Sequence, residues 1–170
     1  AWRAMPSICR LYVAGVILIG FTVVVAFFPL EYPDPATFAL LLACAGLTAA
    51  WKVNLPLPLT NGSTLSVSHA ADLMALFLLT PSQAMLFGVI GAWTQCTVNV
   101  RQRYPFYRTL FSMAAAAITM QITGVAFTWL GGTAHPVALE APPRVMLGAL
   151  VIYFLVNTGL VAGAIASSTQ

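Results

Sequence analysis

Two ionisable side chains, His69 and Asp72, stand in an otherwise apolar stretch of the chain. Residues at positions i and i+3 share one face of a helix, so the imidazole and the carboxylate come within reach of each other. An acid inside a membrane-spanning helix is energetically expensive and marks a functional site by default. Two interpretations stay open: a ligand- or proton-binding site, or a structural lock in which Asp72 pairs with His69 or Arg108.

Two amides, Gln95 and Asn99, follow in the next apolar stretch. Between the two stretches lies Thr80-Pro81, which is typical of a tight turn, because proline is favoured in the first turn of a helix. A hairpin that turns there brings the polar residues of both arms to a similar depth. The sequence therefore predicts one polar cluster, composed of His69, Asp72, Gln95 and Asn99.

Signatures of catalysis are missing from the sequence, which has no HExxH, no GxSxG and no glycine-rich phosphate loop. One histidine and one aspartate also make a poor metal site, because zinc needs further nitrogen or sulfur ligands. We therefore expect a protein that is not an enzyme and has no catalytic residues and no metal. We predict no cofactor, although the polar cluster could bind a lipid, a quinone or a pigment.

The composition indicates that lipid is the solvent for most of the surface. Of the 170 residues, 60% are hydrophobic and only 6% are charged, whereas about a quarter of the residues of a soluble domain are charged. The net charge of +3 does not indicate a nucleic-acid partner, because the basic residues lie at helix ends and form no basic face.

Six apolar segments are separated by polar, proline-rich or charged breaks, and about 20 apolar residues cross a bilayer as a helix. We expect an all-α integral membrane protein, a six-transmembrane-helix bundle forming a single domain over residues 1–170. The predicted spans are 11–30, 37–51, 65–79, 82–98, 106–130 and 145–166.

The charges assign an orientation to this bundle. With both termini inside the cell, six of the seven basic residues lie on the inner side: Arg3, Arg10, Lys52, Arg101, Arg103 and Arg108. The outer loops then carry Arg144 and three of the four acids. This asymmetry follows the positive-inside rule and predicts a multi-pass protein of the bacterial inner membrane, N-in and C-in.

The inner loop that carries Arg101, Arg103 and Arg108 also holds aromatic residues, which suits contact with anionic membrane lipids. Ordinary positive-inside anchoring is the alternative interpretation of this loop. Small residues that allow close helix approach recur at 114–117 (AAAA) and in the GxxxG pattern of Gly159 and Gly163. We expect both to contact neighbouring spans of the same chain; a dimer contact is the alternative.

Four stretches carry a resemblance to a known family: 51–56 (WKVNLP), the strand-like 62–68 (GSTLSVS), the 78–81 turn (LLTP) and the aromatic and basic segment 101–111. The chain resembles the N-terminal polytopic, sensor-type membrane domains of bacterial signalling proteins, which precede a cytoplasmic GGDEF or HD-GYP domain that makes or degrades cyclic di-GMP. The His69–Asp72 pair has no counterpart in that pattern.

The resemblance implies a non-catalytic sensory or input module that acts only with partner domains or chains. The expected partners are membrane lipids together with a fused cytoplasmic output domain or other membrane subunits. The alternative is an accessory subunit docked in a larger bacterial photosynthetic, respiratory or transport complex.

Overall fold

The computed structural model describes residues 6–32, 34–50, 53–54, 64–65, 68–98, 105–132 and 142–168. Within them the regular structure is six helices and one short strand pairing, joined by turns. The helices are α1 (Ser7–Ala26), α2 (Pro35–Ala50), α3 (Ser68–Leu78), α4 (Pro81–Thr97), α5 (Phe106–Trp129) and α6 (Pro143–Ser168). Strands β1 (Val53–Asn54) and β2 (Thr64–Leu65) pair antiparallel, with Val53 opposite Leu65.

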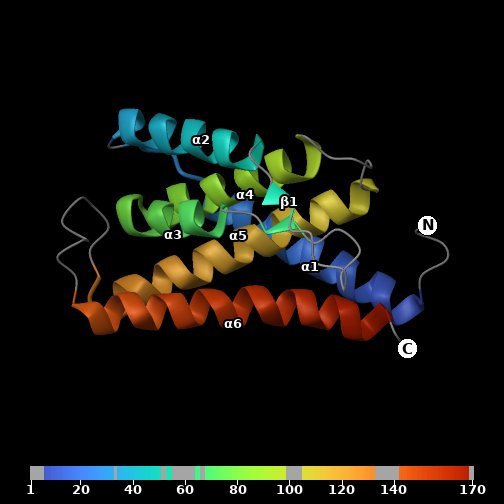
Figure 1. The fold of residues 1–170 in the computed structure, drawn as a ribbon. Coiled ribbons are helices and arrows are strands. Elements are labelled where there is room, and N and C mark those ends of the chain that lie inside the picture. Colours follow the sequence, from blue (N-terminus) through green and yellow to red (C-terminus); the bar gives the residue numbers. More distant parts are fainter. Residues whose placement is uncertain are drawn as a thin grey trace.

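Consecutive helices run in alternating directions along one long axis, and both chain termini lie at the same end of the bundle (Figure 1). Helix α5 crosses the middle of the bundle and packs against α1, α4 and α6. Over half of its most apolar 18-residue window is buried, 56%, against 22% for α1 and 17% for α6. The outer helices therefore turn most of their apolar surface away from the protein.

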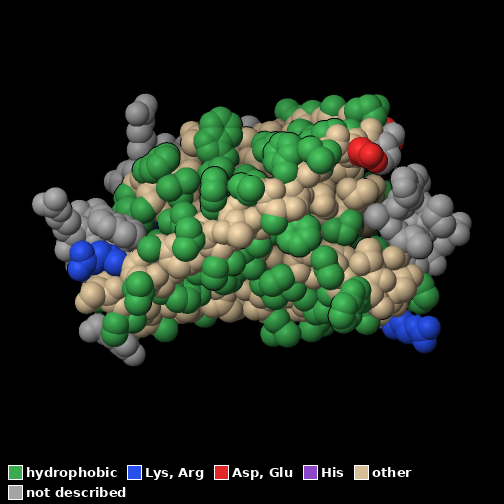
Figure 2. All heavy atoms as spheres, turned by 180° about the vertical axis from the view of Figure 1, so that it is seen from behind, with side chains coloured by type: hydrophobic (Ala, Val, Ile, Leu, Met, Phe, Trp, Pro, Cys, Tyr) green, Lys and Arg blue, Asp and Glu red, His purple; other side chains and the backbone are tan. Residues whose placement is uncertain are grey.

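Three helices, α1, α5 and α6, are long and apolar enough to cross a membrane. Figure 2 shows hydrophobic side chains across the middle of one face, with basic side chains at both ends and acidic side chains at one. Large apolar side chains such as Leu18, Phe154 and Ile165 are more than half exposed. A surface of this kind fits a membrane protein, because soluble monomers rarely expose contiguous apolar patches larger than a few hundred Å².

The other three helices are shorter: α2 has 16 residues, α4 has 17 and α3 has 11. At 1.5 Å per residue, α3 is about 16 Å long, roughly half of the hydrocarbon core of a bilayer. The predicted helix over residues 65–79 is thus wrong at its start, where Leu65 lies in strand β2 and the helix begins at Ser68. Where the first turn of that helix was predicted, Leu65 instead pairs with Val53 of β1.

The first span also differs from its predicted range of 11–30. Helix α1 begins at Ser7, directly after Pro6, and ends at Ala26. Proline at a helix start loses no hydrogen bond, because the first backbone N–H groups have no partner inside the helix. Residues 27–30 are therefore outside the helix, and the helical segment lies four residues nearer the N-terminus than predicted.

The turn between α3 and α4 follows the prediction. The Thr80 hydroxyl accepts from the backbone N–H of Gln83, and the Gln83 side chain accepts from the backbone N–H of Thr80, which is a reciprocal capping box. Pro81 occupies the first helical turn of α4. These caps make the reversal tight, and they align the polar face of α3 with that of α4.

Small residues bring the helices close around α5. Ala114, Ala115 and Ala117 are buried, and a side chain at Gly20 of α1 would collide with the Ala114 backbone. Gly163 of α6 faces the Tyr12 ring of α1, whereas Gly159 has open space around it. The alanine run and Gly163 thus make contacts within the chain, as predicted.

Candidate functional site

One tyrosine joins the two ionisable residues of α3 to α6. The Tyr153 hydroxyl donates to Asp72 Oδ2 over 3.0 Å and lies 3.0 Å from His69 Nδ1. Because the Tyr153 hydroxyl donates its hydrogen bond to the carboxylate, its oxygen is left to accept a hydrogen bond from the Nδ1–H of His69. The direct distance from His69 Nδ1 to Asp72 Oδ2 is 3.8 Å, so the hydroxyl is the closer partner of each.

The three side chains differ in burial along this chain of contacts. Tyr153 is 7% exposed, the Asp72 side chain 14% and the His69 side chain 59%. The His69 and Tyr153 rings meet edge to face, with centroids 6.1 Å apart. The carboxylate is therefore the inner end of the group, and the imidazole is its outer end.

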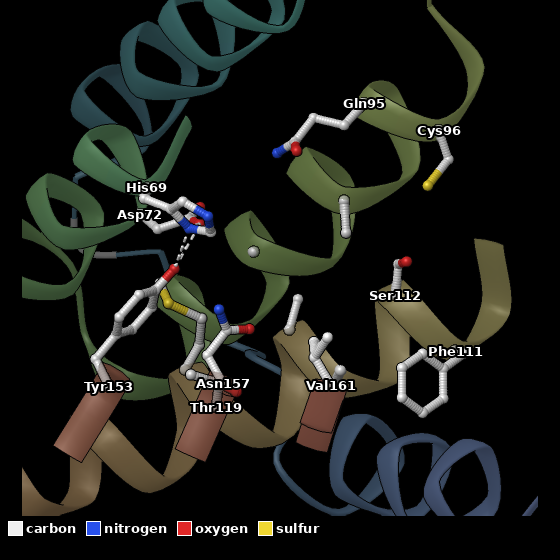
Figure 3. Close-up of a pocket in the computed structure, with 15 residues that line it drawn as sticks. His69, Asp72, Gln95, Cys96, Phe111, Ser112, Thr119, Tyr153, Asn157 and Val161 are labelled. Atoms are coloured by element: carbon white, nitrogen blue, oxygen red, sulfur yellow. Dashed lines mark hydrogen bonds and ion pairs between the residues drawn. The ribbon is translucent and has the colours of Figure 1, made fainter. Parts of the chain in front are cut away.

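These residues form one wall of a cavity of about 160 Å³ between α3, α4, α5 and α6. In Figure 3, the Gln95 amide points from α4 toward His69 and Asp72, and Asn157 and Thr119 lie on the opposite side. The cavity is lined by His69, Asp72, Gly88, Ala92, Gln95, Cys96, Phe111, Ser112, Ala115, Ala116, Thr119, Met120, Tyr153, Asn157 and Val161. About half of these residues carry polar side chains, set among apolar ones.

Close helix packing shapes the floor of this cavity. A side chain at Gly88 of α4 would collide with Met120 of α5, and one at Gly91 would reach the Asp72 carboxylate. Glycine at position 88 thus lets α4 approach α5 closely, whereas at position 91 an added Cβ would only touch Asp72 at an ordinary contact distance. Thr119 is 1% exposed, and its hydroxyl has no hydrogen-bond partner within the described part of the chain.

A second, larger hollow of about 530 Å³ lies between α3 and α6. Its walls are mainly apolar, formed by Leu73, Leu150, Val151, Phe154 and Leu155, and they also include His69, Tyr153 and Asn157. The last three residues line the inner cavity too. The polar residues that bridge α3 and α6 therefore line both hollows.

The structure brings three of the four residues of the predicted cluster to this cavity: His69, Asp72 and Gln95. The fourth, Asn99, lies outside the described residues, as do Arg101 and Arg103. Arg108 is exposed at the start of α5, whereas the Asp72 carboxylate contacts His69 and Tyr153. Whether the cluster serves function stays a prediction.

Sequence reasoning missed Tyr153, Asn157 and Thr119. A signal was present on α6, because Tyr153 and Asn157 are four residues apart and so share one face of a strongly apolar helix. That face meets the His69–Asp72 face of α3. The hydroxyl of Thr119 gave no comparable signal, since a lone threonine is common in membrane helices.

The chemistry that this arrangement supports is hydrogen bonding in a space of low polarity. The lining offers hydroxyl and amide groups that both donate and accept, one carboxylate and one imidazole, and no lysine or arginine. Across the described residues, no three His, Cys, Asp or Glu side chains gather as metal ligands would. The site is suited to a small polar group that can accept and donate hydrogen bonds.

Comparisons of the chain with protein-family models, with curated proteins and with solved structures found no match. The resemblance to the membrane domains of GGDEF and HD-GYP signalling proteins therefore stays a prediction.

Proposed function

We propose that this chain is a non-catalytic, input-type membrane module that binds a small molecule between α3, α4, α5 and α6 and reports its presence to a partner domain or chain. The single observation that carries the proposal is the Tyr153 hydroxyl, which bridges His69 and Asp72 at the wall of a polar cavity. A purely structural lock needs no cavity beside it, whereas a binding site does.

The proposed membrane arrangement is six crossings with both termini inside the cell, in a bacterial inner membrane. The alternating helix directions and the shared end of the two termini support it (Figure 1). Helix α3 and the β1–β2 pairing together form the third crossing in this arrangement. Irregular backbone at membrane depth is tolerated where protein or a cavity covers it.

The packing of α6 supports a route from the site to a partner. Helix α3 packs on α2, α4 and α5 and makes little contact with α6, so the hydrogen bonds of Tyr153 are a main link between the two. A ligand that competes for the Tyr153 hydroxyl would free α6 from α3. Because α6 ends beside the start of α1 (Figure 1), this movement would reach the cytoplasmic side.

A chimera tests this proposal. A soluble diguanylate cyclase GGDEF domain is joined after Gln170, and cyclic di-GMP is measured in cells that express the chimera with wild-type chain, Tyr153→Phe or Tyr32→Phe. Tyr32 supplies the control because its ring packs against Phe38 of α2, with centroids 5.3 Å apart, and does not line the cavity.

We expect Tyr153→Phe to change cyclic di-GMP output about fivefold or more, the lower range of ordinary coupling between sites, and Tyr32→Phe to leave it near wild type. Equal output from all three chimeras, each present in the membrane at the same level, would overturn the input-module proposal. It would favour the accessory-subunit alternative.

A further inference from the structure

The inner cavity borders an apolar hollow at the outer surface of the bundle. The hollow between α3 and α6 shares His69, Tyr153 and Asn157 with the polar cavity, and its other walls are apolar side chains of α3 and α6, among them the exposed Leu150 and Phe154. At about 530 Å³ against about 160 Å³, the apolar part is the larger. A molecule that fills both has a compact polar head and a long apolar tail.

The head that fits is uncharged. A phosphate or carboxylate head would face the Asp72 carboxylate in a lining without lysine or arginine, and a charge in low dielectric is costly without a partner. A cationic head could still pair with the Asp72 carboxylate, although the Tyr153 hydroxyl and His69 already stabilise its Oδ2. We therefore argue for a neutral head, and the competition with decylamine below tests the cationic alternative.

The neutral head must also accept hydrogen bonds. The Thr119 hydroxyl is buried and has no partner in the described part of the chain, and the Asn157 amide lies on the same side of the cavity (Figure 3). A buried polar group is costly to leave unpaired. A ring with carbonyl oxygens on opposite sides can meet groups on both walls, Asn157 on one and His69 on the other. The buried Thr119 hydroxyl would turn toward the ring to gain the partner that it lacks.

We propose that the ligand is a membrane quinone with a single apolar tail, which enters sideways between α3 and α6. The ring occupies the inner cavity, and the tail lies along Leu150 and Phe154. This inference rests on the proposed binding site and names the class of its ligand. No redox step is involved, because binding alone competes for the hydrogen bonds that hold α3 to α6.

The test uses the full chain in lipid nanodiscs and a benzoquinone that carries a ten-carbon tail and a photoreactive azide on its ring. After illumination, the labelled peptides are identified by mass spectrometry. Labelling is repeated with an excess of unlabelled decylbenzoquinone, decanoic acid or decylamine. Equal membrane concentrations of the competitors are used, since the tails dissolve equally well in lipid.

Two pairs of variants accompany the labelling. Thr119→Val removes the unpartnered hydroxyl of the cavity, and Thr123→Val removes an equally buried, unpartnered hydroxyl of α5 that does not line it. Leu150→Trp obstructs the apolar hollow, and Ile165→Trp adds the same bulk to an exposed site of α6 away from it. The labelling of all four variants is compared at equal amounts of protein, once their melting temperatures have shown that each variant is folded.

We expect label on the cavity-facing peptides of α3, α5 and α6, competition by decylbenzoquinone alone, and about tenfold weaker labelling in Thr119→Val and Leu150→Trp only. Label scattered over the lipid-facing surface, or stronger competition by the acid or the amine, would overturn the quinone assignment. So would equal labelling of the two members of each pair. If the chimera responds to Tyr153→Phe while the quinone fails here, the input-module proposal survives and the ligand class alone is rejected.

Discussion

At the scale of single residues, the Tyr153 hydroxyl decides how the polar groups of α3 are satisfied. It takes part in two interhelical hydrogen bonds of 3.0 Å, one to a carboxylate. The Tyr12 hydroxyl makes one bond of the same length to a backbone carbonyl. Hydrogen bonds between membrane helices average about 0.6 kcal/mol, and bonds to charged groups contribute more than neutral ones.

The Tyr153→Phe variant should therefore lose about 1–2 kcal/mol of stability, because it leaves the Asp72 carboxylate without its nearest donor. Tyr12→Phe should lose about 0.6 kcal/mol. Reversible unfolding in a mixed-detergent titration measures both. A smaller loss for Tyr153→Phe than for Tyr12→Phe would contradict the bridging role of Tyr153.

Asp72→Asn should be milder than Tyr153→Phe. The amide keeps the size of the side chain and an oxygen that accepts from Tyr153, while it removes the charge that needs a partner. We expect a loss below about 1 kcal/mol, measured in the same titration. A larger loss than that of Tyr153→Phe would mean that the His69–Asp72 ion pair, and not the hydroxyl, holds α3 to α6.

At the scale of helices, glycine and alanine set how closely α5 and its neighbours approach. The two glycines of the GxxxG pattern on α6 have different surroundings, although they share one helix face. A side chain at Gly163 would collide with the Tyr12 ring, which the bond to Leu160 holds in place, and one at Gly159 would meet open space. Of the two glycines, Gly163 thus contacts a neighbouring helix, and Gly159 lies on the open surface of α6.

Gly163→Ala should destabilise the protein by about 1–3 kcal/mol, the ordinary cost of overpacking. Gly159→Ala should be neutral or slightly stabilising, because alanine favours the helix by up to about 1 kcal/mol. Thermal unfolding in detergent, followed by circular dichroism, compares the two variants. If Gly159→Ala instead dissociated an oligomer in a native gel, the GxxxG pattern would be a dimer contact.

At the scale of the whole molecule, the charged side chains in the described part of the chain lie near the ends of the bundle, apart from Asp72 at the cavity. On the face drawn in Figure 2, basic and acidic side chains lie at the ends and hydrophobic side chains cover the middle. Exposed Glu31 and Asp34 precede α2, at the end opposite to the two termini (Figure 1). This distribution gives the proposed topology a direct test.

In a background with Cys9, Cys44 and Cys96 replaced by alanine, a membrane-impermeant maleimide should label Glu31→Cys in intact cells. It should label Ser168→Cys only after the cells are permeabilised, because the positive-inside rule puts that end in the cytoplasm. Both residues are exposed in the fold. The reverse labelling pattern would invert the topology, and labelling of both from outside would mean an odd number of crossings.

Several features of this protein follow from sequence alone. The composition predicts the membrane class, since 6% of charged residues cannot cover a surface with water-facing groups. Prolines and polar breaks locate the six helices to within a few residues. The spacing of His69 and Asp72, together with the Thr80-Pro81 turn, places Gln95 near them, because local geometry governs all of these contacts.

The tertiary structure alone decides which helix faces meet. In a soluble protein, an apolar stripe identifies the buried face of a helix, but here both the lipid and the core are apolar, so the pattern carries no such information. The pairing of Tyr153 with residues more than 80 positions earlier therefore depends on helix packing around α5. The cavity and the apolar hollow beside it follow from that packing, as does the Thr119 hydroxyl, which has no partner within the described residues.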